Sequence, residues 1–205
     1  MSAATAAAHP PHSSHPAGGG DIHELRALGF WLYLMSDALI FALLFATYAV
    51  MVGNTAGGPS GRDLFDLRNV AYETALLLVS SITFGFASIS ARSGSRGAVL
   101  GWLFVTFLLG AGFVFLEIRE FTGMIAAGAG PQRSGFLSAF STLVGTHGLH
   151  VSMGLVWIVI LGAQVALKGM TVPVGSRLHR LALFWHFLDI AWIGIFSIVY
   201  LPGLM

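Results

Sequence analysis

Several ionisable side chains of this sequence lie inside long apolar stretches, and some of them recur three residues apart. Three such pairs occur: Glu117 with Glu120, His147 with His150, and His186 with Asp189. At that spacing, both members of a pair lie on one face of a helix. Carboxylate and imidazole pairs on neighbouring helices are the ligands of di-iron and zinc sites in helical bundles. The pattern therefore raises the hypothesis of a metal centre.

The elements that carry these pairs must be membrane-spanning helices. Hydrophobic residues make up 56% of the 205 residues and charged residues 9%, whereas soluble domains carry about a quarter charged residues. Five stretches approach the roughly 20 residues that a helix needs to cross a bilayer, and none alternates like a barrel strand. We predict an all-α membrane protein with helices over about residues 27–52, 69–91, 97–121, 136–167 and 178–204.

The remaining segments exclude several classes of function. Residues 1–22 are polar and lack a basic start, which predicts a disordered cytoplasmic tail ahead of one transmembrane domain, residues 23–205. We interpret His9, His12 and His15 as part of this tail rather than as a metal site. The absence of Cys excludes disulfides and iron-sulfur clusters, and a net charge of +1 leaves no basic surface for nucleic acid.

Basic residues at the helix ends predict the orientation in the membrane. On the side of the tail lie Arg26, Arg92, Arg96, Lys168, Arg177 and Arg180. On the opposite side lie Arg62, Arg68, Arg119 and Arg133. Cytoplasmic loops are enriched in Lys and Arg, so this bias predicts a cytoplasmic tail and a periplasmic C-terminus. Arg26, Arg92 and Arg96 are then candidates for contact with the headgroups of the inner leaflet.

Depth along the helices divides the ionisable residues into two predicted layers. Counting about 1.5 Å per residue from the tail end of each helix (Arg26, Arg92, Gly97, Lys168 and Arg180) places Asp37, His186 and Asp189 about 9 to 16 Å deep. About 27 to 34 Å deep lie Glu73, Glu117, Glu120, His147 and His150. This separation is too large for one metal or haem site shared by the two histidine pairs. We therefore predict that Asp37 pairs with the last helix, and that a glutamate of helix 97–121 meets a histidine of helix 136–167.

Around these residues the sequence resembles the haem-copper oxidase subunit III family. The run Val144–Val151 (VGTHGLHV) is similar to the family's fourth-helix signature, and Phe184–Trp192 (FWHFLDIAW) is similar to its last helix. Met35–Phe41 (MSDALIF) resembles the family's Ser-Glu-x-x-Phe-Phe helix, which places Asp37 at its membrane carboxylate. The resemblance extends over about residues 29–205.

Some positions depart from the common pattern of the family. Asp37 stands in place of Glu, Glu117 stands where Gln is usual, and Glu120-Phe121 corresponds to Glu-Tyr. The chain also has room for five helices, whereas members from cytochrome c oxidases usually have seven. Together with the runs 29–37 (GFWLYLMSD) and 55–61 (TAGGPSG), this resembles the shortened branch found in bacterial ubiquinol oxidases.

The resemblance implies a non-catalytic subunit of a proton-pumping oxidase in the bacterial inner membrane. Its haems and copper would lie on the catalytic subunit I, with subunits II and IV in the same complex. The family also implies a V-shaped cleft that holds phospholipid, between the first two helices and the other three. Members are thought to stabilise subunit I and to assist its proton uptake. These implications make a metal or catalytic site on this chain much less favoured.

Three alternatives stay open at this point. A freestanding proton-coupled transporter would favour repeated halves and broken helices, whereas five helices cannot divide evenly and no Pro falls in the middle of a span. A metal-containing membrane enzyme would hold metal in the purified chain. A cytochrome c oxidase subunit differs only in an electron donor that binds another subunit.

Overall fold

The computed structural model describes residues 20–204, and the side chains of residues 20–24, 62, 63 and 204 are not considered. In chain order its elements are α1 (Gly20–Met51), α2 (Gly61–Leu64), α3 (Leu67–Arg92), α4 (Arg96–Ala126), α5 (Gly135–Lys168), α6 (Val172–Ile195), the π-helical turn η1 (Phe196–Tyr200) and α7 (Leu201–Leu204). Within the described residues, five helices are long and apolar enough to cross a membrane. The prediction of an all-helical membrane protein is thereby confirmed, whereas His9, His12 and His15 lie outside the described residues.

The helix ends follow from local sequence. Asp66 caps α3 by accepting a hydrogen bond from the backbone N–H of Arg68 at 2.9 Å, and Ser134 caps α5 in the same way. Gly169 ends α5 with a φ of +71°, a conformation that glycine adopts without strain. The helices extend further than predicted, since α1 begins at Gly20 and α6 at Val172. Helical hydrogen bonding continues past the apolar stretch, so hydropathy alone places helix ends too close to the centre of the membrane.

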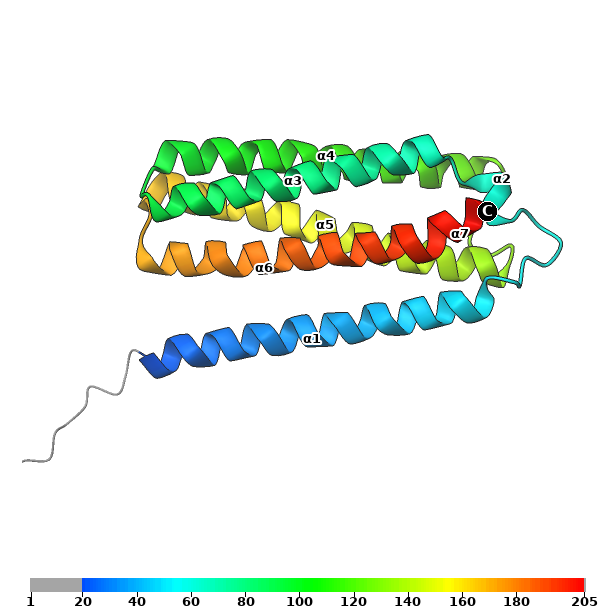
Figure 1. The fold of residues 1–205 in the computed structure, drawn as a ribbon, viewed down its shortest axis with the longest axis horizontal. Coiled ribbons are helices and arrows are strands. Elements are labelled where there is room, and N and C mark those ends of the chain that lie inside the picture. Colours follow the sequence, from blue (N-terminus) through cyan, green and yellow to red (C-terminus); the bar gives the residue numbers. More distant parts are fainter. Residues whose placement is uncertain (1–19, 205) are drawn as a thin grey trace, which may run out of the picture.

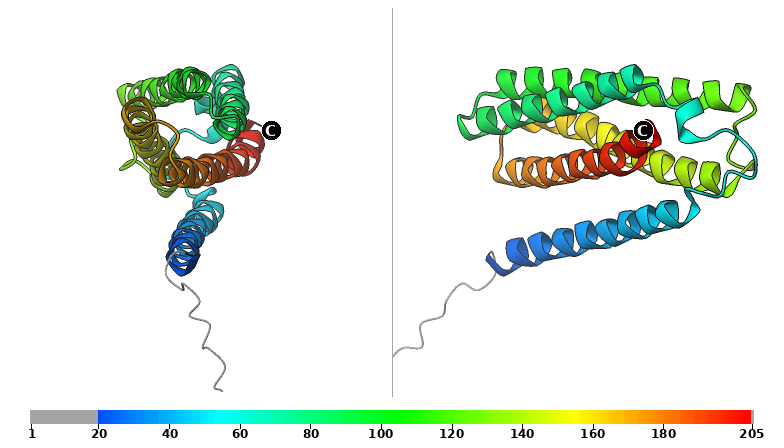
Figure 2. Two further views of the ribbon diagram at one scale, coloured as in Figure 1. Left: turned by 90° about the vertical axis from the view of Figure 1, so that its left-hand side faces the viewer. Right: turned by 45° about the vertical axis from the view of Figure 1, so that its right-hand side comes forward.

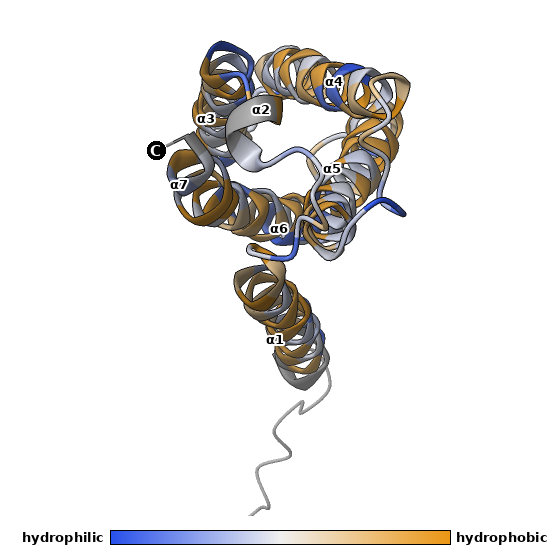
Figure 3. Ribbon diagram, turned by 90° about the vertical axis from the view of Figure 1, so that its right-hand side faces the viewer, coloured by the Kyte–Doolittle hydropathy of each residue, from blue (hydrophilic) through white to orange (hydrophobic). Residues whose placement is uncertain are grey.

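Four of the long helices form a closed unit, and the first one lies outside it. Viewed along the helices, α3, α4, α5 and α6 form a ring, with α1 beside it (Figures 2 and 3). The first helix packs against α5 and α6 and diverges from them toward its N-terminus (Figure 1). We call the end of the bundle that carries α2 and the C-terminus the α2 end, and the opposite one the tail end.

This grouping differs from the cleft that the resemblance implies. The second long helix, α3, packs most extensively against α4 and also contacts α6. A hydrogen bond of 2.8 Å between the hydroxyls of Thr83 and Thr106 joins α3 to α4, and Leu76 packs against Gly112. Because α3 is held in the ring by these contacts, the structure sets α1 alone apart, not the first two helices together.

Trp185 organises the centre of the ring. Its indole ring fills space left by Gly110 of α4 and Gly154 of α5, where a Cβ would come within 2.9 and 3.0 Å of the ring. Its Nε1–H donates a hydrogen bond of 3.1 Å to the hydroxyl of Ser80 on α3. One side chain of α6 thus contacts the other three helices of the ring, and this fixes the rotation of α6 about its axis.

Candidate functional site

Asp37 of α1 and His150 of α5 face each other in the middle of the helices, and the contact is an ion pair when the imidazole is protonated. Asp37 Oδ2 lies 3.8 Å from His150 Nε2, and the side chain of Asp37 is 7% exposed. The other ring nitrogen of His150 lies 2.7 Å from the carbonyl oxygen of Thr146. A carbonyl only accepts, so Nδ1 carries a proton and Nε2 faces the carboxylate. The two groups attract each other only when a further proton is held on Nε2 or on Asp37.

This pair corrects the predicted layering. We expected Asp37 to meet the last helix, whereas its ionisable neighbour is His150 of α5. The depth of Asp37 was counted from Arg26, but α1 begins at Gly20, about 9 Å earlier along the helix. Counted from the true helix end, Asp37 lies about 26 Å deep, close to the depth of about 27 Å for His150. Asp37 therefore lies at the level of His150 and not in the predicted inner layer with the last helix.

His147 connects α5 to α6 in the core of the ring. Its side chain is fully buried, and its Nε2 lies 3.2 Å from the carbonyl oxygen of Leu188 on α6. Because a carbonyl only accepts, Nε2–H is the donor, and Nδ1 has no hydrogen-bond partner within residues 20–204. The rings of Trp192 and Phe113 pack around the imidazole at centroid distances of 5.1 and 5.6 Å. This environment suits a neutral imidazole that holds two helices together.

His186 and Asp189 form a third polar contact, on the surface between α3 and α6. The hydroxyl of Ser81 lies 2.7 Å from His186 Nδ1, and Asp189 Oδ2 lies 3.6 Å from the same nitrogen. The His186 side chain is 47% exposed, whereas that of Asp189 is 10% exposed. The sequence analysis does not identify Ser81, because a serine in an apolar helix gives no signal of its partner.

Three glutamates gather toward the α2 end of α3 and α4. Glu73 is 1% exposed and Glu117 5% exposed, and neither carboxylate has all its oxygens hydrogen-bonded. The carboxylate of Glu117 packs against the backbone of Gly148 on α5, at a point where any Cβ would collide with it. Glu117 therefore reaches helix α5 at Gly148, whereas the predicted meeting of a glutamate with His147 or His150 stays a prediction. Among the described residues, however, no hydrogen bond joins a carboxylate of α4 to His147 or His150.

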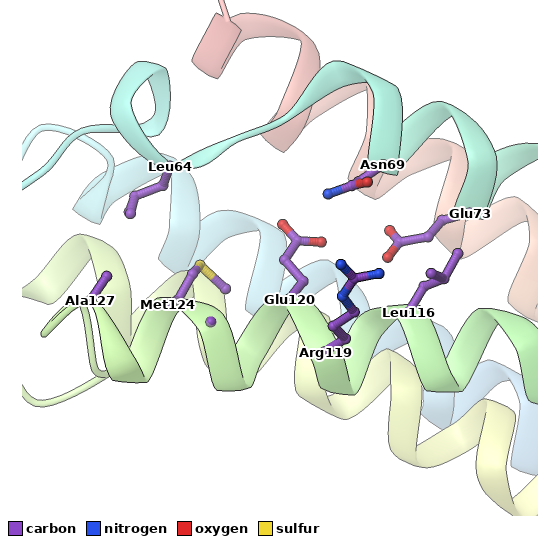
Figure 4. Close-up of a pocket in the computed structure, with 9 residues that line it drawn as sticks. Leu64, Asn69, Glu73, Leu116, Arg119, Glu120, Met124 and Ala127 are labelled. Carbon is purple, nitrogen blue, oxygen red and sulfur yellow. The ribbon is translucent and has the colours of Figure 1, made fainter.

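A cavity of about 340 Å³ lies beside these glutamates, between α3 and α4. Asn69 and Glu73 of α3 point toward Arg119 and Glu120 of α4 across this space (Figure 4). Leu64 of α2 and an apolar stretch of α4 complete the lining. The cavity thus combines polar and charged side chains with a buried carboxylate.

No single metal centre emerges from the predicted ligands. Among the side chains that the structure describes, residues 25–61 and 64–203, no three of His, Asp or Glu come close enough together to hold one ion. His147, His150 and His186 each face a different neighbour, on α6, α1 and α3 respectively. The resemblance-based expectation of bound haem or copper concerns a partner subunit and not these residues.

The three arginines proposed for lipid contact lie near the tail end. Arg26 and Arg92 are exposed, and Arg92 lines a cavity of about 190 Å³ together with His179. The guanidinium of Arg96 packs over Gly169, just beyond the end of α5. A cation at this position interacts favourably with the helix carbonyls, so Arg96 has a structural role of its own.

Comparisons with known proteins match nearly the whole described region. Residues 21–204 match the family described as cytochrome c oxidase subunit III. The cytochrome bo(3) ubiquinol oxidase subunit 3 of Pseudomonas putida is 57% identical over 90% of this chain and 89% of its own. That of Pseudomonas aeruginosa is 55% identical over 95% and 91%. The quinol oxidase subunit 3 of Bacillus spizizenii is 44% identical over 88% and 89%.

Proposed function

The chain belongs to the cytochrome c oxidase subunit III family, and from this premise we propose that it is the non-catalytic subunit III of a haem-copper ubiquinol oxidase. In such an enzyme, electrons pass from ubiquinol to oxygen on the catalytic subunit. The names of the similar bacterial proteins support the quinol as donor. The alternative donor is cytochrome c, because the donor binds another subunit in either case.

One observation about the buried polar residues carries the proposal. Three of the buried histidines and carboxylates connect two helices of this chain: Asp37 with α5, His147 with α6, and Glu117 with α5. Such contacts hold a rigid helical scaffold together. A scaffold without its own redox centre suits a subunit that stabilises a catalytic neighbour and supports its proton uptake.

The partners and cofactors follow from this role. Subunit I would hold the haems and copper, and subunits II and IV would complete the complex. The apolar residues exposed on α1, such as Leu39, Leu43 and Val50, are available to those subunits or to lipid. Phospholipid is the bound component that we assign to this chain, with Arg26 and Arg92 as its contacts in the inner leaflet. Arg96 is the weaker candidate, because it already packs over Gly169.

The protein is a multi-pass protein of the bacterial inner membrane. Its tail end, which carries the larger number of basic residues, is cytoplasmic, and the α2 end faces the periplasm. The positive-inside rule supports this orientation. Accessibility of a cysteine introduced next to Arg62 or next to Lys168 to a membrane-impermeant reagent tests it.

Co-purification is the experiment that tests the proposed function. A tag on this chain should recover a haem-copper catalytic subunit, and the complex should oxidise ubiquinol rather than reduced cytochrome c. Removal of this chain should leave the haem spectrum intact while turnover becomes short-lived. Recovery of the chain alone, with proton-coupled transport in vesicles, would instead support the transporter alternative.

A further inference from the structure

Three carboxylate oxygens at the cavity between α3 and α4 lack any hydrogen bond. They are Glu73 Oε1, Glu73 Oε2 and Glu120 Oε1, and all three atoms are buried. Glu73 as a whole is 1% exposed and points into the cavity (Figure 4). Buried polar atoms are satisfied in nearly all native proteins, so these three acceptors call for a donor that the described residues do not supply.

The burial of the lining residues shows where the cavity opens. Glu73 and Met124 are buried at its floor, whereas Asn69, Arg119 and Gly123 are exposed at its rim. Glu73 lies six residues from the start of α3, which is about 9 Å along the helix. The cavity is therefore close to the end of the spans, at the level where lipid headgroups meet the hydrocarbon.

The rim adds a charge of opposite sign. The guanidinium of Arg119 lines the cavity, and within the described residues no ion pair joins it to Glu73 or Glu120. An arginine with free donors binds phosphate bidentately. The recess thus combines two carboxylates on the inside with one guanidinium at the rim, an arrangement complementary to a zwitterion.

We propose that this cavity binds the headgroup of an aminophospholipid, with the ammonium between Glu73 and Glu120 and the phosphate at Arg119. A primary ammonium has three N–H donors, which match the three unpaired carboxylate oxygens. A trimethylated ammonium has no N–H donor and leaves those oxygens unpaired. A bare metal ion is less suitable, because the described residues do not place three ionisable ligands around one point.

Exposed apolar residues continue from the rim toward the middle of the membrane. Phe115 and Leu108 lie about one and three turns before Arg119 on the same face of α4, and they are 66% and 53% exposed. Tyr72, three residues after Asn69 on α3, is 63% exposed. These side chains provide an apolar surface for the acyl chains of a lipid whose headgroup occupies the cavity. A free amine or phosphate would leave that surface unused.

The proposal can fail without affecting the proposed function, because assembly with a catalytic subunit does not depend on this cavity. To test it, the full-length chain is purified with its native partners and exchanged into phosphatidylethanolamine or phosphatidylcholine. Native mass spectrometry then counts the lipids that stay bound. We expect one phosphatidylethanolamine to be retained by this subunit and phosphatidylcholine to be lost.

Variants locate the bound lipid. Glu73→Gln keeps the shape of the side chain and removes its charge, so retention should fall about tenfold or more. Arg119→Gln should weaken retention in the same direction. The matched control is Arg68→Gln, an exposed arginine near the same membrane surface that does not line the cavity; it should change nothing.

Several outcomes would overturn the proposal. Equal retention of both lipids would show that N–H donors are not recognised. Unchanged retention in Glu73→Gln, with the subunits of the complex still present, would place the lipid elsewhere. A crosslink from a residue introduced at Asn69 to a lysine of a partner subunit, without bound lipid, would assign the cavity to that partner.

Discussion

Asp37 Oδ2 lies 3.8 Å from His150 Nε2, and this contact between ionisable groups joins α1 to the ring of four helices. The ring of Phe41, one turn further along α1, packs against the same imidazole with a centroid distance of 5.4 Å. A polar and an aromatic contact of α1 thus meet at His150, and further aromatic contacts join α1 to Phe136 and Trp157 of α5. The docking of α1 should therefore be sensitive to changes at His150.

A double-mutant cycle with Asp37→Asn and His150→Gln measures this contact. The separation exceeds that of a hydrogen bond, so we expect a coupling free energy of about 1 kcal/mol, as for polar contacts in membrane bundles, not the larger value of a tight buried ion pair. The free energy of unfolding of the wild type, the two single variants and the double variant is measured with increasing concentrations of denaturing detergent. The control cycle pairs Asp37→Asn with His186→Gln and should be additive. Additivity in the first cycle would show that the pair does not contribute.

A change of Gly148 to Ala should weaken the packing of α4 against α5. The new methyl group would occupy the place of the Glu117 carboxylate, so that side chain must move, at a cost of about 1 to 3 kcal/mol. Gly145→Ala is the control on the same helix, because a Cβ at Gly145 meets no atom within 4 Å. Thermal denaturation should show a lower midpoint for Gly148→Ala than for Gly145→Ala. Equal stability would mean that Glu117 rearranges freely.

Thr74→Val should destabilise the contact of α3 with α6. The Thr74 hydroxyl accepts a hydrogen bond of 3.0 Å from Trp192 Nε1–H, and a valine would leave that buried donor unpaired, at about 1 to 3 kcal/mol. The double variant with Trp192→Phe should recover part of the loss, because the donor is then absent. Thr47→Val, on the exposed face of α1, is the control and should be nearly neutral. No recovery in the double variant would argue against this hydrogen bond.

The separated chain should contain no stoichiometric iron, copper or zinc. The chain has no Cys, and its membrane histidines face three different helices. Elemental analysis and an absorption spectrum after thorough washing test this expectation. A retained Soret band or one equivalent of metal would contradict it, and His147 with His150 would be the first residues to substitute.

Delipidation should shorten the working life of the whole oxidase without altering its haem spectrum. Arginines near an anionic leaflet gain roughly 1 kcal/mol each, so Arg26→Ala should also reduce lipid retention. Arg68→Ala, near the opposite surface, is its control. Turnover that lasts as long after lipid removal as before it would leave the subunit with a scaffolding role alone.

The five spans could be predicted from the sequence because length and apolar composition determine which segments cross a membrane. The partners of the buried residues could not. The predicted partner of Asp37 was wrong because the depth of a residue was counted from Arg26, and α1 begins at Gly20. The packing of α3 within the ring depends on which face of each helix meets its neighbour, and so on the rotation of each helix about its axis. Hydropathy does not encode that rotation, since each span is apolar on all sides.

Some polar contacts gave no signal in the sequence. Ser81 and Thr74 are ordinary small residues of an apolar helix, and only the fold brings them to His186 and Trp192. By contrast, the spacing of Glu117 and Glu120 indicated a shared direction toward one region of the bundle. The cavity that Glu120 and Glu73 line could not be predicted from the sequence, because it depends on how the start of α3 lies against the end of α4.

The position of α1 outside the ring has a consequence for biosynthesis. Its main packing partners are α5 and α6, which are the last long helices to leave the ribosome. At usual rates of synthesis, α1 waits on the order of ten seconds in the bilayer before α5 is complete. During that time Asp37 has no imidazole to face. The first helix to be inserted is therefore the last to dock, and nascent chains stalled before α5 should expose it to insertion chaperones.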